Sequence, residues 1–263
     1  MSGPLRISIV TICRDNPEEL AGTCASVDSQ SLAPFEHVVV DGSTDGRIAA
    51  WFGGASQPRY RSCVSESDEG ISDAFNKGVS RSTGDVVVML NAGDRLHDDE
   101  VLARVAEAFG ADPTLQWLHG SMRMRRGGLW VVIGKPFDAR LLYRGMRSTF
   151  HPTMYVRRGL FDCHGGFDTS LRIAMDYDFL CRIAGERHAF LPQPLADFDP
   201  HGVSSTGYLR GLAEMQRVYR RHFGFSAAQW LWRWRQVALH RLLHSPLGRR
   251  LYAWKVRLGW ANR

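Results

Sequence analysis

The chain has 263 residues, of which 44% are hydrophobic and 23% charged, so it can bury a large core. This composition excludes intrinsic disorder, collagen-like repeats and small disulfide scaffolds. The five cysteines are widely spaced and form no Cys-x-x-Cys pair, which predicts a reducing cytosolic environment and no structural zinc site. From the hydropathy pattern we expect neither a secretion signal nor a membrane span.

Charge is unevenly distributed along the chain. The net charge is +6, but residues 208–263 contain twelve Lys and Arg residues against one acid, Glu214, and carry +11. The first 207 residues therefore carry −5, and five of the eight tryptophans lie in the basic part. This asymmetry predicts an acidic catalytic or binding domain, residues 1–206, joined to a basic extension, residues 207–263, that contacts an anionic surface.

The first 110 residues alternate between apolar strand patterns and helical patterns. Four strand–helix units predict an α/β fold with an open, Rossmann-like, mostly parallel sheet covered by helices. The run 85–90 is apolar without alternation, as expected of a strand buried on both faces. The predicted strands are 7–12, 37–40, 60–64 and 86–90, and the predicted helices are 17–29, 46–52, 71–80 and 98–109.

Beyond residue 110 this alternation stops. Two strands at 116–122 and 129–133 flank a Gly-containing turn and predict a hairpin. Helical patterns follow at 155–163 and 176–184, and a last strand is predicted at 188–191. The sequence shows no internal repeat and no low-complexity linker, so we expect one domain that ends near residue 206.

Polar residues gather where the four predicted parallel strands end. Each of these segments is also explained by turn or helix-cap chemistry, but ligands of open α/β sheets bind at this edge. Asp41 is suited to accept hydrogen bonds from a base N–H or a ribose hydroxyl. Lys77 can supply a cation beside a phosphate, or can instead complement the C-terminal end of its helix. The polar segments are 11–14, 41–45, 66–68 and 91–94.

The order and spacing of these motifs resemble a known family. From about residue 6 to residue 205 the chain is similar to family 2 of the nucleotide-sugar glycosyltransferases, and more narrowly to bacterial members that build exopolysaccharide and capsule repeat units. The resemblance implies a GT-A fold, a divalent metal ion (Mg²⁺ or Mn²⁺) and an inverting single displacement. The motifs that carry it are 8–12, 38–45, 69–78, 84–94, 151–153 and 174–178.

The resemblance also implies roles for single residues. Thr11, Asp68 and Asn91 would line the nucleotide pocket together with Asp41. Asp176, at the start of a predicted helix, would be the general base that takes the proton of the acceptor hydroxyl. An acid at that position is equally favoured by the helix dipole alone.

A metal site is expected after the fourth strand. Family members commonly carry Asp-x-Asp there, whereas this chain reads Asn91-Ala-Gly-Asp94. Mg²⁺ and Mn²⁺ often combine one or two carboxylates with phosphate oxygens and water, so Asp94 alone can serve. His201 is either a second ligand or a plain surface residue. Asp178 is expected to orient the acceptor or the base, and His151 either contacts the acceptor or a phosphate, or is structural.

The basic extension shows helical periodicity in three stretches, 212–223, 230–238 and 247–258. Basic amphipathic helices with Trp lie flat on anionic bilayers, with the rings at headgroup depth. The alternatives are a helical cap on the catalytic domain and a dimer interface.

These observations predict a metal-dependent hexosyltransferase. We expect it to move a hexose from a nucleotide-diphosphate sugar, a UDP-sugar in preference to a GDP-sugar, to a lipid-linked glycan acceptor. It is expected in the cytoplasm, at the inner face of the cell membrane, with no nucleic-acid partner. One alternative is a nucleotidyltransferase, which would normally show a Gly-rich phosphate loop that residues 11–15 lack. Another is a nucleic-acid-binding protein that uses the basic, Trp-rich extension.

Overall fold

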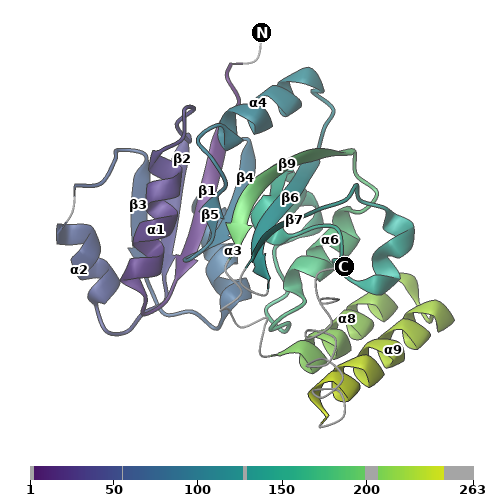
Figure 1. Ribbon diagram of the computed structural model, residues 1–263. Coiled ribbons are helices and arrows are strands. Elements are labelled where there is room, and N and C mark those ends of the chain that lie inside the picture. The colour runs from purple at the N-terminus through teal and green to yellow at the C-terminus, as the bar shows by residue number, and fades with distance from the viewer. Residues whose placement is uncertain (1–2, 55, 127–128, 199–206, 246–263) are drawn as a thin grey trace.

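The computed structural model describes residues 3–54, 56–126, 129–198 and 207–245 (Figure 1). In this part of the chain nine strands form one sheet in the order β3-β2-β1-β4-β8-β6-β9-β5, with β7 paired to β6. The strands are β1 (Ile7–Cys13), β2 (Glu36–Asp41), β3 (Arg61–Ser65), β4 (Val86–Asn91), β5 (Arg95–Leu96), β6 (Trp117–Arg126), β7 (Leu129–Ile133), β8 (Met154–Arg157) and β9 (His188–Phe198). The helices are α1 (Pro17–Asp28), α2 (Arg47–Gly54), α3 (Ile71–Arg81), α4 (Val101–Ala111), α5 (Gly159–His164), α6 (Met175–Ile183), α8 (Tyr208–Phe223) and α9 (Ala227–His244), with 3₁₀ turns η1 (Ala139–Arg144) and η2 (His151–Thr153).

Strands β1 to β4 form the parallel half of the sheet, which confirms the predicted α/β architecture. β1 lies between β2 and β4, with Thr11 opposite Val39 on one side and Leu90 on the other. All seven residues of β1 are buried, which is why this strand has no polar alternation. These strands end at the lower edge of the sheet in Figure 1, so the polar segments that follow them lie at one edge.

The second half of the sheet departs from the prediction at residues 154–157. The helix expected over 155–163 is wrong for its first part, because Met154–Arg157 forms β8 and only Gly159–His164 is helical. β8 lies antiparallel between β4 and β6, with Tyr155 opposite both Val88 and Leu118. Apolar residues at 154–156 are buried on both faces of the sheet, and tertiary burial of this kind overrides local helical periodicity.

The last predicted strand is present but longer than expected. β9 continues from residue 188 to 198 through Pro192 and Pro194. Its pairing with β6 shifts register on both sides of Ser121, and such irregularities accommodate proline within a sheet. The predicted β6–β7 hairpin is confirmed.

Helix α3 packs against β1 and β2 and positions a distant loop. A Cβ atom on Gly78 would lie 2.1 Å from Cγ1 of Val10, so glycine is needed for this close approach. Two residues earlier, the side chain of Asn76 exchanges two hydrogen bonds with the backbone of Phe167, at 2.8 and 2.7 Å. The helix therefore holds the loop that precedes α6.

The first two helices predicted for the basic extension are confirmed, as α8 and α9, which lie side by side at the lower right of Figure 1. Val218 of α8 is fully buried in the same hydrophobic cluster as Phe75 of α3 and Phe179 of α6. The third helical stretch, 247–258, lies outside the described residues. Among the described helices, none is long and apolar enough to cross a membrane. The division into domains 1–206 and 207–263 stays a prediction, and α8 shares the core of the first.

Candidate active site

Asp41 and Asp68 come from two different strand ends, and the carboxylate of Asp68 lies against Gly42, the residue that follows Asp41. Asp41 is fully buried at the end of β2, where Oδ1 accepts the backbone N–H of Ser43 and Oδ2 accepts the hydroxyl of Ser65, both at 2.8 Å. A Cβ atom on the following residue, Gly42, would lie 1.8 Å from Oδ2 of Asp68. Only glycine therefore lets the Asp68 carboxylate rest against the end of β2.

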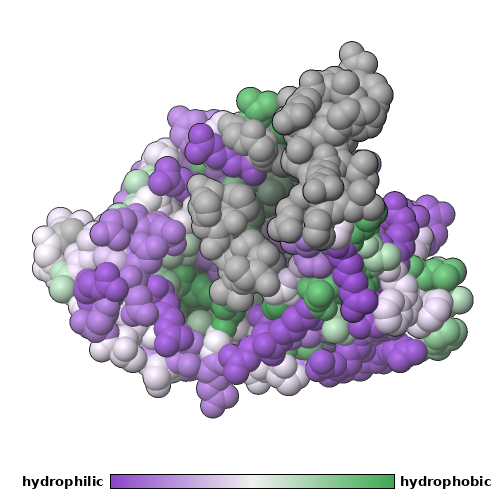
Figure 2. Space-filling view, turned by 60° about the horizontal axis from the view of Figure 1, so that its bottom comes forward, coloured by the Kyte–Doolittle hydropathy of each residue, from purple (hydrophilic) through white to green (hydrophobic). Residues whose placement is uncertain are grey.

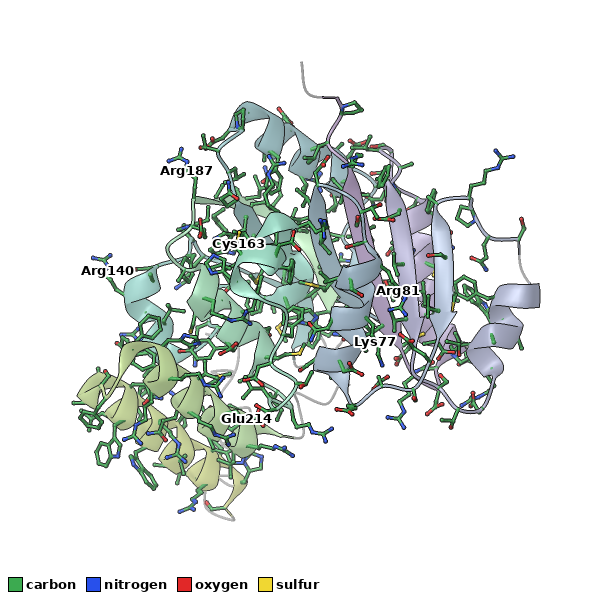
Figure 3. The ribbon with its side chains drawn as sticks, turned by 180° about the vertical axis from the view of Figure 1, so that it is seen from behind. Lys77, Arg81, Arg140, Cys163, Arg187 and Glu214 are labelled. Carbon is green, nitrogen blue, oxygen red and sulfur yellow. The ribbon has the colours of Figure 1, made fainter. Side chains whose placement is uncertain are left out.

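Lys77 anchors the loop that carries Asp68. Its Nζ atom lies 2.8 Å from Oδ2 of Asp73 and donates to the carbonyl oxygen of Ser67 at 2.7 Å. The hydrogen bond with Asp73 is the main reason that the pKa of Lys77 is raised. The C-terminal capping role is wrong, because α3 continues one full turn to Arg81; both side chains are labelled in Figure 3.

The hydroxyl of Thr11 has a hydrogen-bond partner inside the protein. Its Oγ1 atom lies 2.9 Å from Nε2 of the buried His37, whose Nδ1 accepts a hydrogen bond from Nε of Arg61 at 3.0 Å. Burial, and secondarily the charge of Arg61, lower the pKa of His37 to about 3, so the imidazole is neutral. The Thr11 hydroxyl thus has an internal partner, and its contact with a nucleotide stays a prediction.

Asn91, Asp94 and His151 form one hydrogen-bonded group at the end of β4. Oδ2 of Asp94 accepts the backbone N–H of Asn91 at 3.0 Å and its Nδ2 at 3.2 Å. The same Nδ2 lies 3.0 Å from Nε2 of His151, which therefore acts as the acceptor. Burial lowers the pKa of His151 to about 4, so it is neutral. His151 is thus placed beside the two residues that were predicted to bind nucleotide and metal.

Burial also raises the pKa of Asp94 to about 7, and the charge of Glu19 adds to the effect. Glu19 lies on α1 and reaches the neighbouring Gly93, where a Cβ atom would be 3.5 Å from its Oε2. Glu19 was not predicted from the sequence, because Pro-Glu-Glu at the start of a helix is already explained by the helix dipole. Glu19 and Asp94 therefore both lie at the segment 91–94, which itself contains a single acid.

The described residues contain no group of three or more His, Cys, Asp or Glu side chains arranged to hold a metal ion. Oδ1 of Asp94 receives no hydrogen bond from this part of the chain, whereas Oδ2 receives two. One carboxylate oxygen thus fits a Mg²⁺ or Mn²⁺ ion that takes its remaining ligands from a diphosphate and water. His201, the other predicted ligand, lies outside the described residues.

Asp176 opens α6 above a small apolar cavity. Its Oδ1 accepts the backbone N–H of Tyr177 at 2.7 Å, and burial raises its pKa to about 6. A carboxylate whose pKa lies near neutrality is suited to take a proton. His151 lines the same cavity, so Asp176 and the group at the end of β4 face a common space. The other lining residues are Phe75, Met89, Met154, Phe167, Met175 and Phe179.

Asp178 joins α6 to α8 and does not face the cavity that Asp176 lines. It is buried, and its Oδ2 accepts Nε of Arg182 at 3.1 Å while its Oδ1 lies 2.8 Å from Nε2 of His222. Both oxygens of Asp178 thus have partners within the fold, and its role in orienting the acceptor or the base stays a prediction.

Glu214, the single acid of the basic extension, holds the loop before α6. Its Oε2 accepts the backbone N–H groups of Arg172, Ile173 and Ala174 at 3.2, 2.8 and 3.1 Å, and its Oε1 accepts Nε of Arg210 at 3.1 Å. From the sequence, Glu214 was notable only as the single acid among the basic residues 208–263. No local pattern links residue 214 to a loop forty residues earlier.

The chain is similar to known glycosyltransferases in sequence. The sequence model described as Glycosyl transferase family 2 matches residues 8–166. The Mycobacterium tuberculosis glycosyltransferase Rv1514c is 29% identical over 278 aligned positions, which cover 100% of this chain and 97% of that protein. A PGL/p-HBAD biosynthesis glycosyltransferase of Mycobacterium bovis is 34% identical over 161 positions, which cover 60% of this chain and 61% of the relative.

Two solved structures share the fold. Residues 1–349 of S. aureus TarS, in complex with UDP-GlcNAc, match with a TM-score of 0.65 at 16% identity, over 86% of this chain and 69% of that one. The mannosyltransferase PcManGT of Pyrobaculum calidifontis, in complex with GDP-Man and Mn²⁺, matches with a TM-score of 0.62 at 19% identity, over 98% and 81%. In a longer TarS structure the chain corresponds to 41% of the length.

Proposed function

Since the chain belongs to glycosyl transferase family 2 and has the GT-A fold, we propose that it transfers a hexose, with inversion, from a nucleotide-diphosphate sugar to a lipid-linked glycan acceptor. The observation that carries this proposal is the placement of Asp176. A carboxylate with a raised pKa shares one cavity with His151, which is hydrogen-bonded to the group at the end of β4. A proton acceptor is thus placed near the expected position of the donor diphosphate.

The donor nucleotide is assigned to the ends of β1, β2 and β4. Asp68, whose carboxylate lies against Gly42 at the end of β2, is assigned to a base N–H or a ribose hydroxyl. Asp41, whose oxygens accept from Ser43 and Ser65, is assigned to the same pocket. Asn91, which donates to Asp94, is assigned to the diphosphate end of the donor. We assign UDP in preference to GDP; one structural relative is described with UDP-GlcNAc and another with GDP-Man.

A divalent cation, Mg²⁺ or Mn²⁺, is assigned to Oδ1 of Asp94, with His201 as the second candidate ligand. When bound, such an ion stabilises the charge that develops on the diphosphate leaving group. Side chains of the protein act on the acceptor hydroxyl. Asp176 takes the proton of the attacking hydroxyl, and the neutral His151, whose Nε2 is occupied by Asn91, limits the volume beside it.

Attachment to the cytoplasmic face of the membrane is supported by α9. Its outward face exposes Trp230, Leu231 and Trp234, which are 44%, 61% and 45% exposed, next to basic residues. Figure 2 shows green hydrophobic side chains among purple hydrophilic ones at its right, the side on which Figure 1 places α8 and α9. Such a surface suits anionic lipid headgroups, and an enzyme held there meets lipid-linked acceptors at high local concentration.

The test is a panel of nucleoside diphosphates and nucleotide sugars, scored by thermal stabilisation with and without Mn²⁺. A ligand that binds only the folded state raises the melting temperature, so one nucleoside diphosphate should stand out. With the matching sugar donor, the anomeric configuration of the product is then read by NMR. No stabilisation by any nucleoside diphosphate, or a product that retains the donor configuration, would contradict the proposal.

A further inference from the structure

A second, larger cavity lies beside the one under Asp176. It has an empty volume of about 1170 Å³, part of it open to solvent, and is bounded by the segment after β7, by η1 with the residues that follow it, and by α8 and α9. None of the residues assigned to the donor nucleotide lines this cavity. Residues that form it include Lys135, Arg144, Arg147, Phe150, Met215 and Trp232.

The cavity is cationic. Lys135, Arg144 and Arg147 line it, no lining residue is acidic, and none of the three forms an ion pair with a carboxylate in the described ranges. The guanidinium groups of Arg144 and Arg147 lie 5.3 and 5.2 Å from the centre of the Trp232 ring. Stacking on Trp232 holds both groups in place without neutralising them. Three unneutralised cations at one cavity favour an anionic ligand, and paired guanidinium groups suit phosphate oxygens.

The same cavity has an apolar wall. Met146 and Phe150 contribute to it from the segment after η1, and Leu212 and Met215 contribute from α8. A small anion without an apolar portion would not contact this apolar wall. The combination of cationic and apolar linings therefore fits an amphipathic molecule that carries a phosphate group and a hydrocarbon portion.

The cavity is also connected with the candidate base. Phe150 lines it, and the next residue, His151, lines the cavity below Asp176. The hydroxyl of Tyr177, the neighbour of Asp176, donates to the carbonyl oxygen of Leu142 in η1 at 2.6 Å, which fixes the two regions relative to each other. The linings of the two cavities therefore share the chain segment Phe150–His151.

From these contacts we propose that the cavity binds the phosphate group of the lipid-linked acceptor and the first part of its lipid chain. This inference rests on the proposed function, and it adds the acceptor class: a lipid phosphate or diphosphate. Phospholipid headgroups of the bilayer share the same phosphate chemistry. Placement in a recess adjoining the Asp176 cavity favours the acceptor.

The experiment measures binding of decyl phosphate below its micellar concentration by titration calorimetry, with decanol and inorganic phosphate as partial ligands. The variant Arg144→Gln/Arg147→Gln removes two cations from the cavity. The matched control, Arg217→Gln/Arg241→Gln, removes the same charge from exposed positions on α8 and α9. Lys135→Gln is a second, milder variant in case the double variant does not fold.

We expect decyl phosphate to bind more tightly than decanol or inorganic phosphate. The cavity variant should weaken it about tenfold or more, and Lys135→Gln by a smaller factor, with the control unchanged. Equal binding by wild type and cavity variant, or no binding by the wild type, overturns the inference. The same variants are also tested for binding to vesicles that contain phosphatidylglycerol. If the cavity variant loses binding to these vesicles but still binds decyl phosphate, the cavity is assigned to bilayer headgroups, and the inference is overturned. UDP binding, measured in parallel, tests the proposed function separately, because neither variant touches the donor residues.

Discussion

The carboxylate of Glu214 accepts a hydrogen bond from the backbone N–H of Ala174, two residues before the candidate base Asp176. Figure 3 labels Glu214 on α8, the first helix of the basic extension. Together with the bonds from Arg172 and Ile173, this contact makes α8 a support of the loop that leads into α6. A cut after residue 206 would remove that support, so the contribution of the extension to membrane binding is better tested by point substitutions.

Glu214→Gln should lower the free energy of unfolding by about 1–3 kcal/mol, because three backbone N–H groups lose a charged acceptor. Burial alone would raise the pKa of Glu214, but the hydrogen bonds from Ile173 and Ala174 outweigh it, and the pKa is lowered from 4.5. A lowered folded-state pKa stabilises the fold above that unfolded value and loses its effect as the pH falls through the folded value. The difference between wild type and variant in urea should therefore be present at pH 7 and shrink below pH 4.5.

The control for this measurement is Glu107→Gln, since Glu107 is exposed on α4. It should change the free energy of unfolding by less than about 0.5 kcal/mol. An equally large effect at position 107, or a Glu214→Gln penalty that does not depend on pH, would contradict the assigned role.

Asp176→Asn should lower turnover by about 10² to 10⁴ while the affinity for UDP stays unchanged, because the substitution removes proton acceptance and little volume. Burial raises the pKa of Asp176 to about 6, and a base must be ionised to act. The wild-type rate should therefore fall as the pH drops below about 6, in a pH profile of kcat/KM. Asp162→Asn, at an exposed position on α5, is the control. Loss of UDP affinity in Asp176→Asn would instead place Asp176 in the donor site.

Removal of divalent ions with a chelator should abolish turnover, and Mn²⁺ should restore it. In Asp94→Asn the increase in UDP affinity that Mn²⁺ produces should disappear, because the oxygen assigned to the ion loses its charge. Glu19→Gln should reduce that increase without removing it, since Glu19 lies beside Gly93 and not on the ion. Full activity in chelator would refute the metal assignment.

Trp230→Ser/Trp234→Ser should weaken binding to anionic vesicles by about tenfold or more, because two interfacial aromatic rings are removed. Both rings are about half exposed, so thermal unfolding should change little. The matched control is Leu32→Ser/Phe35→Ser, which replaces two exposed apolar side chains outside the basic extension. If both pairs reduce sedimentation with vesicles equally, α9 has no special part in membrane contact.

Much of the site was predictable residue by residue. Asp41 and Asn91 end β2 and β4, Asp68 and Asp94 come shortly after β3 and β4, and parallel strands end at one edge of a sheet. The hydrogen-bond partners of the site residues were not predictable. The hydroxyl of Thr11 turned out to bond the buried His37, which no spacing in the chain indicates.

The sequence by itself determined the four strand–helix units of the first 110 residues, the polar strand ends and the first two helices of the basic extension. Each of these depends on periodicity, capping or composition within a short segment. Only the tertiary structure decided that 154–157 is a strand, that Glu19 lies beside Gly93, that Glu214 holds the loop before Asp176, and that Lys135, Arg144 and Trp232 line one cavity. These relationships join residues tens of positions apart, and they arise from how elements pack, which no local pattern encodes.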